Sequence, residues 1–92
     1  MGLYLVRALV KPGAEEPFRA WVDDPEAATP GFETDLQAAI RAGHFSGPRV
    51  YFTVESPRGD PRELVADILG DWLTLQSSVP VHEVSHGDFE RD

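Results

Sequence analysis

The segment that most constrains the fold is residues 3–10, with the sequence LYLVRALV. Successive side chains of a β-strand point to opposite faces, so Leu3, Leu5 and Leu9 share one face. The residues at the even positions are also apolar and occupy the other face. A strand covered on one side alternates apolar and polar residues, whereas this pattern indicates cover on both sides. A short chain cannot easily supply two covering layers, so the pattern predicts a second subunit or a ligand on one face.

Length and composition indicate one globular domain. The chain has 92 residues and buries about two-thirds of its unfolded surface on folding. Its hydrophobic content of 41% is ample for a packed core. We expect a single domain over residues 1–87 and a polar C-terminal tail over residues 88–92. The absence of cysteine excludes a disulfide framework and a thiolate metal site.

The net charge of −8 disfavours nucleic acids and anionic membranes as partners, because both require a basic binding surface. No apolar run approaches the ~20 residues that span a bilayer. No basic-then-apolar leader precedes the first strand, so we expect a cytoplasmic protein. Acidity of this kind is typical of a soluble protein surface. A decoy that mimics DNA phosphates is the alternative, although the carboxylates are spread along the chain rather than massed on one helix.

Amphipathic segments predict three helices. Residues 14–22 carry apolar side chains at the spacing i, i+3, i+4. Residues 32–42 fit the helical and the strand period equally well. We favour the helix because helix formers dominate and β-branched residues are few. A third helix is predicted from Asp60, with Asp60 as N-cap, Pro61 at the first helical position and Glu63 in the first turn.

The remaining strands complete an α+β pattern. Residues 44–47 predict a loop or a very short strand that pairs with a strand over residues 49–55. A last strand is predicted from Val79 to about Ser85, and the apolar residues up to Leu73 are assigned to the third helix. This order is the split β-α-β pattern of a ferredoxin-like antiparallel sheet with helices on one face.

Three short motifs resemble the dimeric α+β barrel superfamily. Residues 3–12, with LYLVR followed by VKP, look like the opening strand of muconolactone isomerases. Residues 42–48, with AGHF followed by GP, are similar to the helix end and hairpin of YciI-like members. The VES motif at residues 54–56, ahead of a capped helix, recurs in the group. The resemblance implies a homodimer whose two sheets close on each other around a small-molecule pocket.

Arg7 is the first candidate for a substrate-binding residue. Its neighbours on the strand face are leucines, and a guanidinium in such surroundings needs a partner or a ligand carboxylate. One interpretation is an ion pair with Glu55 or Glu83 at a strand edge or an interface. The other is an anchor for an anionic substrate.

Tyr51, Thr53 and Glu55 share one face of the strand over residues 49–55. If that face lines the pocket, Tyr51 and Glu55 are candidate catalytic residues and Thr53 a candidate substrate contact. Partial burial raises the pKa of a glutamate and suits it to shuttle a proton. The alternative is a solvated face, or one paired with arginine.

His82 and His86 lie on one face of the predicted last strand. Residues four apart on a strand are about 13 Å apart, too far to bind one metal ion directly, so we expect no metal site. We expect His82 to act as an acid or base and His86 to contact substrate. The alternative is a pair of surface or interface histidines.

These observations converge on a homodimer that binds a small aromatic or carboxylated molecule. The expected chemistry is proton transfer without a cofactor, as in isomerisation, cyclisation or monooxygenation of an activated substrate. The alternative is a non-catalytic module that docks another protein on the open face of its sheet.

Overall fold

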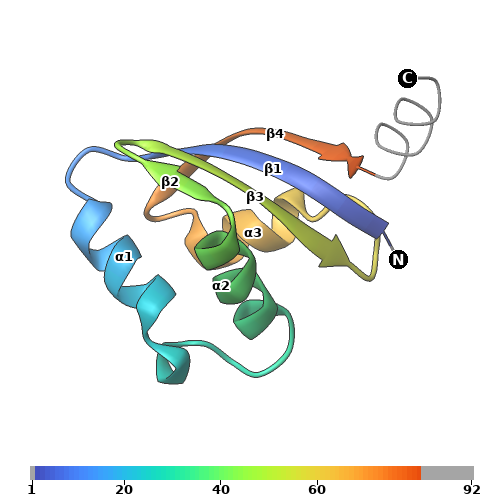
Figure 1. The fold of residues 1–92 in the computed structure, drawn as a ribbon, viewed down its shortest axis with the longest axis horizontal. Helices are drawn as coiled ribbons and strands as arrows, with labels where there is room; N and C mark the ends of the chain where they lie inside the picture. The colour runs from blue at the N-terminus through green and yellow to red at the C-terminus, as the bar shows by residue number, and fades with distance from the viewer. Residues whose placement is uncertain (1, 82–92) are drawn as a thin grey trace.

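The computed structural model describes residues 2–81 (Figure 1). The chain forms β1 (Gly2–Val10), α1 (Glu15–Asp23), a short 3₁₀ helix η1 (Pro25–Ala27), α2 (Phe32–Ala42), β2 (His44–Ser46), β3 (Arg49–Ser56), α3 (Arg62–Leu69) and β4 (Leu73–Pro80). None of the helices among these residues is long and apolar enough to cross a bilayer.

The four strands form one sheet in the order β2-β3-β1-β4, and every neighbouring pair is antiparallel. The three α-helices lie on one side of this sheet (Figure 1). The α+β class and the antiparallel sheet are therefore confirmed, and the strand order is compatible with a ferredoxin-like fold. The first crossover, from β1 to β2, contains both α1 and α2.

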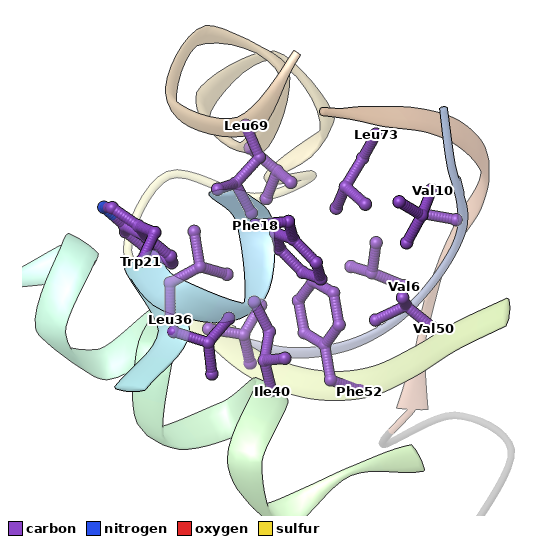
Figure 2. Packing of buried hydrophobic residues seen from close by; sticks show 14 of the residues in the cluster. Val6, Val10, Phe18, Trp21, Leu36, Ile40, Val50, Phe52, Leu69 and Leu73 are labelled. Atoms are coloured by element: carbon purple, nitrogen blue, oxygen red, sulfur yellow. The ribbon is translucent and has the colours of Figure 1, made fainter. Parts of the chain in front are cut away.

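The core lies between the sheet and the helices. Val6 and Ala8 of β1, together with Val50 of β3, are completely buried. Figure 2 shows Val6 and Val50 among apolar side chains of all three helices, with Phe18 of α1 between them and α3. The Phe18 ring centroid lies 5.3 Å from that of Phe45, so the α1 helix is packed directly against the hairpin of β2 and β3.

Residues 32–42 form a helix, as the helix formers predicted. Leu36, Gln37 and Ile40 are its buried stripe. Gly31 precedes the helix with φ of 117°, a conformation that side chains disfavour, and its N–H donates to Thr34 Oγ1. Gly43 follows the helix, where a Cβ would overlap the carbonyl oxygen of Tyr51. The two glycines therefore set where the helix begins and where β2 can approach β3.

Buried Gln37 fastens α2 to the end of α1. Its Nε2 donates to the carbonyl oxygens of Trp21 at 2.7 Å and Asp24 at 2.8 Å. Each carbonyl also accepts a backbone N–H, that of Asp24 at Trp21 and that of Ala27 at Asp24. Gln37 therefore adds a second donor to each and ties α2 to the end of α1.

The predicted position of the last strand is wrong. β4 begins at Leu73, whereas the sequence pattern predicted a start at Val79. The α3 helix ends at Leu69, so Leu73 belongs to the strand. A register shift opposite Arg7 and Ala8 interrupts the alternation of apolar and polar residues in β4, which hid the strand period. The rest of the predicted last strand, and the predicted tail over residues 88–92, lie outside the described residues.

Candidate functional site

The candidate site is the side of the sheet opposite the helices, here called the open face. Register and burial place the following side chains on it: Leu3, Leu5, Arg7 and Leu9 of β1, His44 and Ser46 of β2, Arg49, Tyr51, Thr53 and Glu55 of β3, and Thr74, Ser77 and Val79 of β4. β1 thus presents apolar side chains on both sides of the sheet. Its helix side is buried, and its open face is partly exposed.

A polar row crosses the open face at Tyr51, because His44 and Arg7 are its register partners on the two neighbouring strands. The rings of His44 and Tyr51 stack with centroids 5.3 Å apart and planes inclined by 18°. Arg7 Cζ lies 5.6 Å from the centroid of the Tyr51 ring. Each of these contacts contributes about 0.5–1.5 kcal/mol. The Tyr51 ring thus contacts a side chain from each of the two neighbouring strands.

Apolar residues adjoin this row. Leu5 and Leu9 are half-buried, Leu3 is 36% exposed and Val79 is 42% exposed. Exposed apolar side chains gathered on one face are typical of a binding surface. The open face thus combines an apolar middle with a positive and aromatic row.

The structure separates Glu55 from Tyr51, although both belong to the open face. Glu55 lies opposite Leu3, about 13 Å along the strand from Tyr51. It lines two adjoining grooves of about 350 and 230 Å³ together with Asp35 of α2. Thr53 lies between the two ends and lines the larger groove. A ligand would have to extend along β3 to reach both the phenol and the carboxylate.

Arg7 forms no ion pair with Glu55, the one of its two predicted partners that lies within the described residues. Within residues 2–81, the ion pairs are Arg19–Glu15 at 3.4 Å and Arg62–Asp60 at 3.9 Å, and Arg7 takes part in neither. Its guanidinium is exposed and contacts the Tyr51 ring. Glu83, the other predicted partner, lies outside the described residues. Arg7 therefore retains donors for a group that approaches the open face.

The two histidines of the predicted last strand, His82 and His86, lie outside the described residues. The histidine that the structure does bring to the candidate site is His44, which the sequence analysis left out of it. The signal was the hairpin: with Ser46 opposite Arg49 across the turn, His44 must lie opposite Tyr51. Residues 2–81 contain no group of three or more potential metal ligands.

Comparison of the chain with protein-family models, with curated proteins and with solved structures found no match.

Proposed function

We propose that two copies of this chain pair through their open faces as a dimeric α+β barrel and bind a small aromatic carboxylate between the sheets. The observation that carries the proposal is the composition of the open face. It combines apolar residues, whose exposure to water is unfavourable, with an arginine and an aromatic row. An interface that only buried apolar surface would not require the polar row.

The charges of the open face favour a second copy of the same chain as the partner. In a twofold interface the same surface meets itself. A twofold axis across the strands at the level of Leu5 and Thr53 places Arg7 of one subunit over Leu3 of the other, beside Glu55 of that second subunit. Each subunit then supplies one cation and one anion to the other.

The size of the open face sets the strength expected of this pairing. Strands spaced about 4.8 Å apart and rising about 3.3 Å per residue give each face a projected area of roughly 500 Å². This area is at the low end for stable interfaces. We therefore expect a dimer whose population depends on concentration in the micromolar range.

The row of Arg7, Tyr51 and His44 is the proposed ligand contact. An arginine recognises a carboxylate through paired N–H donors. The short side chains of Thr53 and Ser77 leave room beside the longer Arg7 and Tyr51. The proposed reaction is proton transfer without a cofactor, with Tyr51 and Glu55 as the groups that move protons, together with His82.

A reciprocal charge exchange tests the pairing. Arg7→Glu and Glu55→Arg each place like charges together and are expected to yield monomers in sedimentation equilibrium. The double variant is expected to restore the dimer. Arg62→Glu on α3 is the matched control and leaves the equilibrium unchanged. A double variant that stays monomeric would overturn the proposed orientation. A native chain that is monomeric at all concentrations would overturn the dimer and favour the docking of another protein.

Ligand binding is tested separately by NMR titration with benzoate. Saturable shifts are expected at Arg7, Tyr51 and Thr53, and benzyl alcohol, which lacks the charge, is expected to bind at least about tenfold more weakly. Equal shifts with both compounds would contradict the role of Arg7. No saturable shift on the open face would contradict an aromatic carboxylate as the ligand class.

A further inference from the structure

A second pocket lies on the helix side of the sheet, where the C-terminal ends of α1 and α2 approach β2. Its volume is about 400 Å³, within the range of small-molecule sites. Its lining combines both signs of charge with apolar surface, from Arg19, Val22, Asp23, Ile40, Arg41 and Phe45. The pocket shares no lining residue with the open face.

Protein contacts hold both guanidiniums of this pocket in place. Arg41 Nη1 donates to the carbonyl oxygen of Val22 at 2.7 Å, at the end of α1. Arg19 Cζ lies 4.3 Å from the centroid of the Phe45 ring, and its Nη2 is 3.4 Å from Glu15 Oε2. A guanidinium carries five N–H donors. Each arginine therefore keeps donors for a ligand although its position is already restricted.

The charges around the two arginines restrict which charged groups a ligand of this pocket can carry. A carboxylate would bind the free guanidinium donors. A purely anionic ligand would also meet the carboxylate of Asp23 and the partial negative charge at the C-terminal ends of α1 and α2. An ammonium group on the same ligand would turn Asp23 from a repulsive group into a partner. The lining thus favours a zwitterion over a simple acid.

We propose that this pocket binds a free α-amino acid with an apolar side chain. Its carboxylate contacts Arg19 and Arg41, its ammonium contacts Asp23, and its side chain lies against Phe45 and Ile40. The site requires only one chain, so it does not depend on the pairing of the open faces.

NMR titration of the ¹⁵N-labelled chain with L-leucine tests the ligand class. Saturable shifts are expected within residues 19–23 and 40–45. The acid 4-methylpentanoate lacks the ammonium and 3-methylbutylamine lacks the carboxylate, so each is expected to bind at least about tenfold more weakly. Equal binding of leucine and 4-methylpentanoate would overturn the zwitterion. No saturable shift with leucine up to its solubility limit would overturn the site.

Two variants test the residues. Arg19→Gln and Asp23→Asn are each expected to weaken leucine binding by at least about tenfold. The matched control for the arginine is Arg62→Gln, since the side chains of Arg62 and Arg19 are 57% and 54% exposed. Asp67→Asn on α3 is the control for the aspartate. Native affinity in Arg19→Gln, or an equal loss in Arg62→Gln, would contradict the proposed contacts. Arg41 is left unchanged because it also caps α1.

Discussion

The two faces of β1 carry similar side chains but differ in what covers them. Val6 and Ala8 are fully buried beneath the helices, whereas Leu3 on the other face is 36% exposed. The helix side receives its cover from α1, α2 and α3 of the same chain. Within residues 2–81, the open face has no such cover. An apolar pattern therefore specifies that a face must be covered, but not what covers it.

Substitutions at two adjacent residues of β3 are expected to give the largest difference in stability between the two faces. Phe52 is 2% exposed on the helix side, and its neighbour Tyr51 is on the open face. Phe52→Ala is expected to lower the free energy of unfolding by about 3–5 kcal/mol because it leaves a cavity. Tyr51→Ala loses mainly its ring contacts, about 1–2 kcal/mol. Urea denaturation of dilute protein measures both values. Equal losses would mean that the open face is packed as tightly as the core.

The next prediction tests how much the hydrogen bonds of Gln37 stabilise the packing of the helices on the sheet. Gln37→Leu preserves the approximate volume but removes the donors to the carbonyls of Trp21 and Asp24. Each carbonyl keeps one backbone donor, so losing the two side-chain hydrogen bonds is expected to destabilise the fold by about 1–3 kcal/mol. Thermal unfolding measures the loss. Faster hydrogen exchange confined to α1 and the following loop would locate the defect. A variant as stable as the native chain would show that water takes the place of the Gln37 donors.

Much of the helix side could be predicted from the sequence, because local signals specified it. The helix formers of residues 32–42 and the turn before β3 were sufficient to place α2 and β3. β4 was misplaced because its register shift breaks the strand period, which depends on pairing with a distant segment. The grouping of Tyr51 and Thr53 on one face followed from alternation, and the distance of Glu55 from Tyr51 follows from the rise of a strand. The place of Glu55 beside Asp35 could not be predicted, because it depends on the packing of α2.

A substitution at Leu3 tests whether a second subunit covers the open face. Because Leu3 is partly exposed in one chain, Leu3→Lys is expected to change the free energy of unfolding of dilute protein by no more than about 0.5 kcal/mol. In a dimer, the same lysine is forced into the apolar interface, so the melting temperature is expected to lose its dependence on concentration. Ala20→Lys, on the exposed surface of α1, is the control. A native chain without any concentration dependence would contradict the pairing.

The effect expected at Asp60, at the edge of the helix side, is small and depends on pH. The nearby hydroxyl of Ser78, which is buried, lowers the pKa of Asp60 below its ordinary value of 3.8. The backbone N–H and the charge of Arg62 act in the same direction.

A lowered pKa means that the folded state favours the ionised carboxylate. The contribution to stability is therefore fully present above pH 3.8 and is lost as the pH falls through the lower pKa of the folded state. The N-cap of α3 is Pro61 rather than the predicted Asp60, whose Oδ1 accepts from the Arg62 N–H. Asp60→Asn keeps an oxygen that can accept this hydrogen bond but removes the charge. Because the side chain is 49% exposed, solvent screening should limit the loss at neutral pH to less than about 1 kcal/mol. Urea denaturation across acidic pH should show the native chain and the variant converging in stability as the pH falls. A difference that grows toward low pH would mean that the carboxyl stabilises the fold in its protonated form.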